Sequence, residues 1–362
     1  MAVEEQFLGN PETLTEYPDI ANIIRENIIR EKKSTYACNS IWASEIGHDC
    51  ERYLVYQQCR GEDAKPTEDD LLLVFNEGDN QERQLIIDLQ KANIKVKDLQ
   101  LRFTVKKINL SGKLDLIAEL KDSNGEMFFA PVEVKSMHPS VFTSIETVAD
   151  LNKYPWTRKY YAQLMFQLQN DQWSYPFGYF LCKNKSTGEI KVIKDLDGSS
   201  VVKFNQQYYD ELIEKGKRVF RTVTANKIIQ SQLMMAEDEA EKEALMSQMR
   251  YPERIKYDLK VCGGCKYNHI CIANIIDSDT KRLSDSANAT VKEYLRAKQQ
   301  REIYSQAEKE YKKADAEMKK LFPLQEDLYT SSEYIVQTKV TNGKNPYLKF
   351  DIQNLGDYND EK

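Results

Sequence analysis

Residues 112–135 read GKLDLIAELKDSNGEMFFAPVEVK, and this stretch decides the fold that we expect. It contains two apolar, strand-like runs separated by Asp-Ser-Asn-Gly, and Asn-Gly is the strongest short signal for a β-hairpin. Each run carries one acid, Asp115 in the first and Glu133 in the second. A carboxylate on a buried strand is costly unless a charge or a metal ion pairs with it. The stretch therefore predicts a hairpin that carries a polar site.

The length of the turn decides whether the two acids meet. Glu133 and Lys135 are two positions apart, so they share one face of their strand. A two-residue turn at Asn124-Gly125 would place Asp115 opposite Val134, on the wrong face. A loop of odd length or a single bulge moves Asp115 beside Glu133 or Lys135. We therefore expect an odd loop or a bulge.

Two carboxylates and a lysine on one face fit phosphodiester hydrolysis. The oxygens of Asp115 and Glu133 suit Mg²⁺ or Mn²⁺, which are hard cations. Such an ion lowers the pKa of a bound water and stabilises the charge that develops on the phosphate. Lys135 would orient the attacking water or help to deprotonate it. The alternative interpretation is that these residues are solvated charges on a surface hairpin.

The flanking sequence alternates between helix and strand patterns. Residues 71–92 and 157–170 have the apolar spacing of helices, and residues 203–250 are mostly helical and highly charged. Residues 101–108 read as one more strand, and residues 173–196 as two. The pattern predicts an α/β fold.

Composition excludes several classes of protein. The chain has 362 residues, of which 41% are hydrophobic and 30% charged, which is typical of a globular protein. No apolar run approaches the roughly 20 residues that span a bilayer, and the acidic start has no apolar signal segment. We therefore expect a cytoplasmic protein with no membrane partner (in the host cytoplasm if a phage encodes it). The net charge of −6 argues only weakly against DNA, because phosphate contacts need a local basic groove.

Seven cysteines are present, and this odd number in a large chain argues against a disulfide framework. Cys262, Cys265 and Cys271 form the pattern C-x2-C-x5-C, which favours a metal site. Thiolate sites bind iron–sulfur clusters or zinc, and in a zinc site His269 would replace a cysteine. Because only three thiols lie close in the sequence, a fourth ligand must come from elsewhere.

The acids and the lysine resemble the motif of the PD-(D/E)XK nucleases, specifically of their RecB-like exonuclease branch. That family has an Asp on one strand and Glu-x-Lys on the next, which correspond here to Asp115, Glu133 and Lys135. The resemblance implies a restriction-endonuclease-like fold, in which a mixed central sheet is flanked by helices. It covers roughly residues 40–275.

Two helical motifs extend this resemblance. The family has a glycine on an upstream helix and an acid or histidine four residues later, which match Gly78 and Glu82. It also has Gln-x-x-x-Tyr on a helix after the core; Gln163 fits, but Gln167 replaces the tyrosine. The resemblance implies a catalytic set of Asp115, Glu133, Lys135 and Gln163, with Mg²⁺ or Mn²⁺ held by Glu82, Asp115 and Glu133.

The same resemblance suggests the fourth thiol. RecB-like exonucleases of the CRISPR-associated and AddB kinds have one upstream cysteine, commonly before Pro-Arg, and three near the end of the nuclease domain. Cys50 is followed here by Glu51 and Arg52, so only the arginine is kept. The resemblance implies a [4Fe–4S] cluster, with zinc as the alternative, on Cys50, Cys262, Cys265 and Cys271.

Residues 152–161, NKYPWTRKYY, interleave cations with aromatic side chains. Such a stretch can bind phosphates and stack on single-stranded bases. It is equally typical of a helix start whose cations extend toward solvent. The predicted DNA contacts are Arg52, Arg158, Lys159 and Tyr160.

Three segments are expected: a helical lead-in at 1–35, the RecB-like nuclease domain at 36–275, and a helical extension with a short β tail at 276–362. In the last, a heptad stripe from Tyr304 to Leu321 predicts a helical hairpin or packing against the body, and it offers a surface for self-association or for a protein partner.

The expected function is that of an exonuclease acting on DNA ends, in recombination, repair, or CRISPR or phage DNA processing. An endonuclease that uses the same site is one alternative. The other is a catalytically silent iron–sulfur or zinc subunit that binds DNA.

Overall fold

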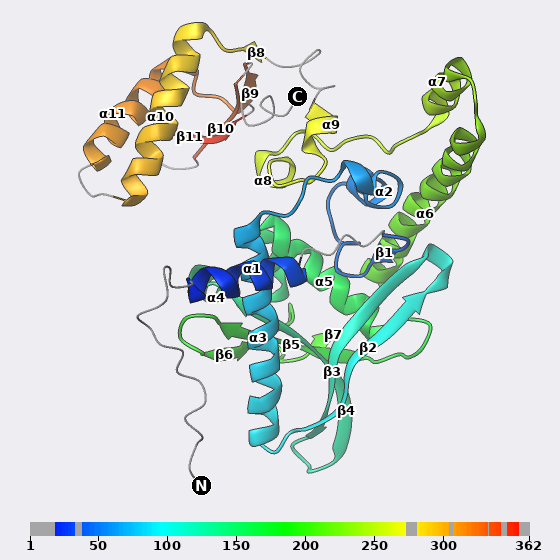
Figure 1. The fold of residues 1–362 in the computed structure, drawn as a ribbon. Helices are drawn as coiled ribbons and strands as arrows, with labels where there is room; N and C mark the ends of the chain where they lie inside the picture. Colours follow the sequence, from blue (N-terminus) through cyan, green and yellow to red (C-terminus); the bar gives the residue numbers. More distant parts are fainter. Residues whose placement is uncertain are drawn as a thin grey trace, which may run out of the picture.

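The structure, a computed structural model, describes residues 19–32, 38–272, 281–303, 307–331, 333–341 and 346–354 (Figure 1). Its helices are α1 (Ile20–Lys32), α2 (Glu51–Cys59), α3 (Asp69–Lys91), α4 (Pro139–Ser144), α5 (Pro155–Leu168), α6 (Gln206–Met235), α7 (Glu239–Gln248), α8 (Leu259–Cys262), α9 (Asn268–Ile272), α10 (Asp285–Ile303) and α11 (Ala307–Leu321). Its strands are β1 (Ile41–Trp42), β2 (Lys95–Val105), β3 (Leu110–Lys121), β4 (Met127–Met137), β5 (Phe177–Asn184), β6 (Ile190–Val192), β7 (Val202–Lys203), β8 (Lys281–Arg282), β9 (Asp327–Thr330), β10 (Tyr334–Val340) and β11 (Leu348–Asn354).

The main sheet is built around β3, which pairs antiparallel with β2 and with β4. β4 pairs in parallel with β5, β5 pairs antiparallel with β6 and β7, and β1 adds a short parallel pairing to β3. A parallel pair needs a crossover connection, and the segment with α4 and α5 supplies it. The expected α/β fold, with a mixed sheet flanked by helices, is confirmed at this level.

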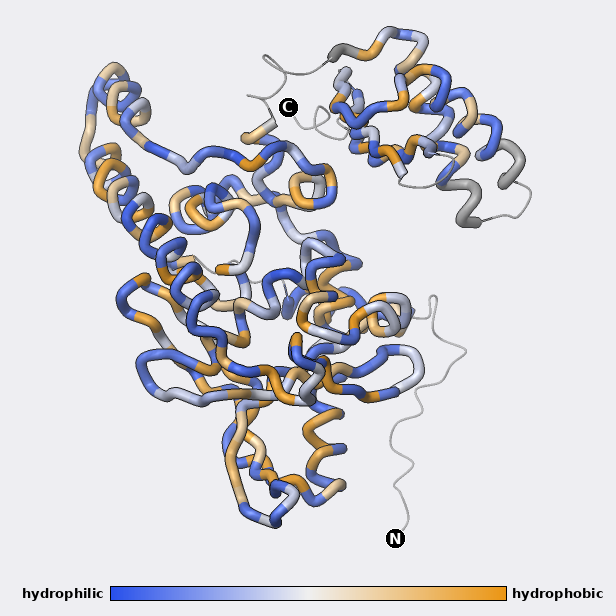
Figure 2. The backbone as a smooth tube through the Cα atoms, turned by 180° about the vertical axis from the view of Figure 1, so that it is seen from behind, coloured by the Kyte–Doolittle hydropathy of each residue, from blue (hydrophilic) through white to orange (hydrophobic). Residues whose placement is uncertain are grey.

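The two faces of β4 have different partners because side chains alternate along a strand. Val132 and Val134 pack with Leu116 of β3 and Leu85 of α3. Glu133, which lies between the valines, points to the other face and contacts α5. α3 and α5 therefore cover opposite faces of the sheet, and Figure 2 shows apolar stretches along its strands and along α3.

The hairpin between β3 and β4 has a loop of odd length. The ladder closes at Lys121 opposite Met127, so residues 122–126 form the loop. Gly125 adopts φ +83, a left-handed conformation that glycine accepts without a steric penalty. The expectation of an odd loop is confirmed.

This loop sets the register of the hairpin. Leu116 lies opposite Val132, and the same register continued by one residue places Asp115 opposite Glu133. The two acids therefore share the face that α5 covers. A two-residue turn would have placed Asp115 on the α3 face, because one step of register moves every side chain to the other side.

The C-terminal segments have a core of their own. α10 and α11 form a helical hairpin that packs on a sheet in the order β11-β10-β9-β8. Ala314 and Met318 of the predicted heptad stripe are buried in this core, whereas Tyr304 lies outside the described residues. The expected helical hairpin is confirmed, and the expected strand pair is β10 and β11. The buried residues of this stripe therefore pack against other segments of the same chain.

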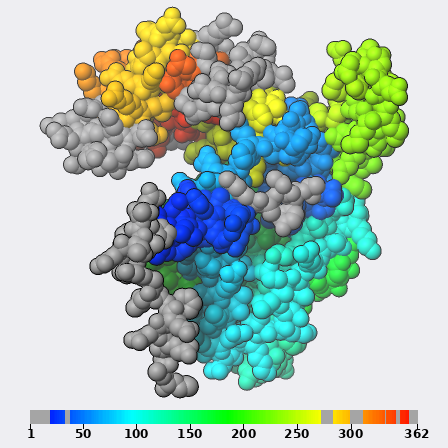
Figure 3. Space-filling view, in the orientation of Figure 1, coloured from blue at the N-terminus to red at the C-terminus, as the bar shows by residue number. Residues whose placement is uncertain are grey.

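The helix expected within residues 1–35 is α1, which packs against α3 through contacts that include the Arg25–Asp70 ion pair at 3.3 Å. α7 and the C-terminal end of α6 project from the rest of the molecule in Figure 3. Among the described helices, none is long and apolar enough to cross a bilayer.

Gly112 in β3 provides a test of this packing. A Cβ added there would lie 2.7 Å from the Ala43 Cβ and would collide with the ring of Phe103, which is fully buried. We expect Gly112→Ala to lower the free energy of unfolding by about 1–3 kcal/mol, measured by urea denaturation. Gly61→Ala is the control, because its added Cβ meets no atom within 4 Å. Equal stability of the two variants would contradict the packing described here.

Candidate functional site

Glu133 is completely buried in β4, and both of its carboxylate oxygens are bound. Oε1 forms an ion pair with Lys135 Nζ and accepts a hydrogen bond from Gln163 Nε2 at 2.6 Å. Oε2 accepts a hydrogen bond from Gln167 Nε2. Charge pairing and hydrogen bonds of this kind are what permit an acid to be buried. The structure therefore brings together three of the predicted catalytic residues and adds Gln167.

Asp115 and Glu82 complete a cluster of three acids. Asp115 Oδ2 accepts a hydrogen bond from the Val134 backbone N–H at 2.9 Å, which holds it beside Glu133. Glu82 of α3 is half-buried. Burial is the largest cause that raises the pKa of Glu82 above its ordinary value, and the charge of Asp115 is the second. The predicted metal ligands thus come from α3, β3 and β4 and lie close enough to interact.

Lys135 is the cation of this cluster. Its Nζ lies 5.0 Å from the centre of the Tyr160 ring, a cation–π distance. Burial on its own would lower the pKa of Lys135, but the negative charges of Glu133 and Asp115 outweigh it and raise the pKa. Lys135 therefore stays protonated over the whole neutral range, which makes it a donor and not a base.

The acids outnumber the cation that neutralises them. Burial, and then the charge of Asp115, raise the pKa of Glu133 to about 8, against the opposing effect of Lys135. No group of three His, Cys, Asp or Glu side chains in the described part of the chain is arranged to hold a metal ion as it stands. The donor chemistry nevertheless suits a hard cation, because buried carboxylates with raised pKa values gain from added positive charge.

Gln100 of β2 is a site residue that the sequence analysis missed. The β2–β3 register on either side of it places it opposite Asp115. Its Nε2 donates to Glu82 Oε1 at 2.5 Å, and its Oε1 accepts from Lys113 Nζ. Its backbone is left-handed at φ +53, which is strained for glutamine and is typical of functional sites. Nothing in the sequence around Gln100 indicates this conformation.

Gln167 was also not expected to have a role. It is fully buried, and its Nε2 donates to Glu133 and to the Lys113 carbonyl oxygen, the latter at 2.9 Å. Its Oε1 is buried without a partner among the described residues. Since Gln163 lies one helical turn earlier, the two amides hold Glu133 from the same face of α5. Helical spacing from Gln163 was the signal that could have identified it.

The four predicted cysteine ligands line one pocket. Cys50 is the N-cap residue of α2, Cys262 ends α8, Cys265 lies in the following turn and Cys271 lies in α9. His48 also lines this pocket, whereas His269, the alternative zinc ligand, does not. The fold thus joins Cys50 to thiols more than two hundred positions away.

The thiols are close enough to influence one another. Burial raises the pKa of Cys262 to about 11 and that of Cys265 to about 12, and the neighbouring cysteines add to both shifts. These two thiols are therefore protonated at neutral pH in the absence of a metal. A metal centre binds thiolates and would displace those protons. The four thiols have the donor chemistry of a tetrathiolate centre, although in the described residues they are not arranged as a metal-binding group.

The predicted DNA contacts have internal partners. Arg158 pairs with Asp49 at 2.7 Å, and Lys159 pairs with Glu45 at 2.5 Å. Arg52 donates from Nε to the Pro252 carbonyl oxygen at 2.7 Å. Tyr160 lies over Lys135, at the acid cluster. The three cations therefore tie neighbouring segments together in this structure, and their contact with DNA stays a prediction.

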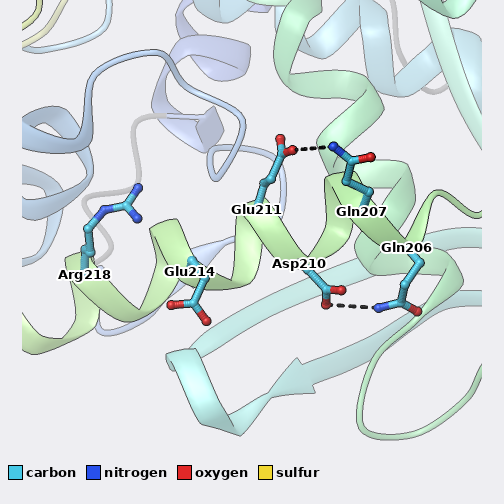
Figure 4. A pocket seen from close by; sticks show the side chains of 6 residues that line it. All are labelled: Gln206, Gln207, Asp210, Glu211, Glu214 and Arg218. Atoms are coloured by element: carbon cyan, nitrogen blue, oxygen red, sulfur yellow. Dashed lines mark hydrogen bonds between the residues drawn. The ribbon is translucent and has the colours of Figure 1, made fainter.

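A separate hollow runs along α6 (Figure 4). All the side chains that line it come from that one helix, and most are acids or amides that bond to each other, such as Gln206 with Asp210 at 3.0 Å and Gln207 with Glu211 at 3.2 Å. It includes none of the acids or thiols described above. The hollow is a solvated helix face and not part of the site.

Comparison with protein-family models and with curated protein sequences found no match for this chain.

The pKa shift of Glu133 predicts how stability depends on pH in metal-free protein. A carboxyl whose pKa is raised on folding stabilises the fold fully below pH 4.5, and this contribution is lost as the pH rises to about 8. We expect Glu133→Gln to reduce the fall in unfolding free energy between pH 5 and pH 8 by on the order of 2–4 kcal/mol. Urea denaturation in EDTA at pH 5 and at pH 8 measures the free energy of unfolding of each protein. Glu119→Gln, on β3 beyond the site, should keep the wild-type slope; equal slopes for all three proteins would contradict the assignment.

Proposed function

We propose that the chain is a metal-dependent DNA nuclease of the PD-(D/E)XK type, similar to the RecB-like exonucleases. The convergence of Glu82, Asp115 and Glu133 with Lys135 carries this proposal. The charge of Asp115 helps to raise the pKa of Glu82 and of Glu133, and acids placed together in this way are unfavourable for folding and typical of functional sites. The order of the elements supports it too, because α3, β3, β4 and α5 carry the acids, the lysine and the glutamine in the order that the resemblance expects.

The mechanism assigns each side chain a distinct task. Glu82, Asp115 and Glu133 would hold Mg²⁺ or Mn²⁺, which when bound supplies an activated water and positive charge next to the phosphate. Gln163 and Gln167 fix the orientation of Glu133 through one oxygen each. Lys135 would donate to a phosphate oxygen or orient the water, since its raised pKa makes it a poor base.

We also propose that Cys50, Cys262, Cys265 and Cys271 hold a [4Fe–4S] cluster, with zinc as the alternative. The common pocket of the four thiols supports this proposal. Hydrolysis needs no electron transfer, so the role of the cluster is structural. A cluster that joins Cys50 to Cys262 closes a loop of more than two hundred residues, which removes much of the entropy of the unfolded chain. Binding of the cluster therefore contributes to folding.

An exonuclease that acts on DNA ends remains the preferred form of the activity. An endonuclease would use the same acids, and the described geometry favours neither. A catalytically silent DNA-binding subunit is disfavoured, because a protein without catalysis would have no use for Lys135 and three converging acids.

Cleavage of DNA tests the proposal directly. We expect the wild-type chain to degrade end-labelled linear DNA in Mg²⁺ or Mn²⁺ and to spare closed circular DNA. Asp115→Asn and Lys135→Ala should each slow cleavage roughly 100-fold or more, since they remove a metal ligand and the charge next to the phosphate. Glu119→Gln is the matched control on the same strand and should cut like wild type. Cleavage by Asp115→Asn at the wild-type rate would refute the assignment, and cutting of circular DNA would favour the endonuclease.

The thiol proposal has its own test. We expect protein purified without oxygen to be brown and to contain iron, and Cys262→Ser to lose both colour and thermal stability. Cys38→Ser is the control, because Cys38 does not line the pocket. Absorption spectra, metal analysis and thermal melts provide the measurements. A colourless protein with one zinc per chain would favour the alternative, and full stability of Cys262→Ser would contradict both metals.

A further inference from the structure

One face of α5 points at the acid cluster along its length. Gln163 and Gln167 contact Glu133, and Tyr160 covers Lys135. Together with Trp156 these α5 residues have the spacing i, i+4, i+7 and i+11, which keeps them within roughly 60° of one another around the helix. Trp156 therefore continues the site by one turn, roughly 6 Å along the axis.

Trp156 lies near the carboxyl end of β4. α5 runs back along β4, because Gln163 is level with Glu133 and Tyr160 is level with Lys135. One more turn toward the start of α5, roughly 6 Å, reaches the level of Met137, the last residue of the strand. Ligands of open α/β sheets bind at the carboxyl ends of strands, so Trp156 stands where a substrate would enter.

The indole of Trp156 is open on the outside and supported from behind. The residue is 51% exposed, and its N–H donates no hydrogen bond to the part of the chain that the structure describes. The ring of Tyr154 lies 4.9 Å from it, with an angle of 31° between the planes. Tyr154 is itself held by a hydrogen bond between its hydroxyl and Ser144 Oγ at 3.1 Å. The indole is thus a rigid aromatic surface that faces solvent.

We infer that Trp156 stacks on an unpaired base of the DNA strand in the active site, so that the substrate is single-stranded next to the bond that is cut. This inference rests on the proposed function. Every base has a π face and stacks on an aromatic ring without regard to sequence, whereas a base inside a duplex is already stacked on its neighbours. Arg158 and Lys159 have internal partners, which leaves stacking as the main source of the preference.

Binding of oligonucleotides tests the inference, with every protein carrying Asp115→Asn to prevent cleavage. Fluorescence anisotropy would compare labelled oligo(dT) with a blunt duplex of equal length. We expect Trp156→Ala to bind oligo(dT) roughly tenfold more weakly with little change for the duplex, and Trp156→Phe to retain most of the affinity. Oligo(dT) should also quench tryptophan fluorescence, and Trp156→Phe should abolish that quenching.

Tyr347→Ala is the control, because Tyr347 is a similarly exposed aromatic residue, 49% accessible, in the C-terminal segment. It should bind both DNAs like the parent protein. Unchanged oligo(dT) binding by Trp156→Ala, or an equal loss for oligo(dT) and duplex, would overturn the stacking role. Neither of these binding results tests the nuclease proposal. That proposal stands if the wild-type chain shows DNA cleavage that depends on Asp115, and it fails if the cleavage assay shows none.

Discussion

The burial of Glu133 is the constraint on which the rest of the site depends. A carboxylate with no exposed surface is tolerated only if its charge and both oxygens are satisfied, and Lys135, Gln163 and Gln167 provide this. These contacts fix how α5 lies on the sheet, since two successive turns of the helix must present their amides to β4. They also place Tyr160 over Lys135. The polar contacts therefore align the helix that borders the site, while apolar packing supplies most of the stability.

The third acid reaches the cluster at the cost of backbone strain. Glu82 belongs to α3, which covers the opposite face of the sheet from α5, and Gln100 holds it by a hydrogen bond. The left-handed backbone of Gln100 is unfavourable for a residue with a side chain, so the surrounding β2–β3 ladder must impose it. The strained residue lies directly opposite Asp115, and its side chain binds Glu82, the acid that comes from α3.

The acid cluster and the thiol pocket are linked by the segment that precedes α2. Glu45 pairs with Lys159 of α5, and His48 accepts a hydrogen bond at Nδ1 from the Cys50 backbone N–H at 3.0 Å. The ring of His48 stacks on Tyr53 at 4.1 Å, and burial lowers the pKa of His48 to about 4, so it is neutral at physiological pH. Arg158 and Lys159, which were predicted to contact DNA, thus tie α5 to the segment that precedes α2 in this structure.

Local periodicity determined a large part of this protein from its sequence alone. The hairpin of residues 112–135, the shared face of Glu133 and Lys135, and the helices that became α3 and α5 all follow from patterns of a few residues. The tertiary structure alone decided that Gln167 contacts Glu133 and that Gln100, with its left-handed backbone, contacts Glu82. The physical reason is that repeats of two or 3.6 residues report on one strand or helix, whereas these contacts depend on how several elements pack.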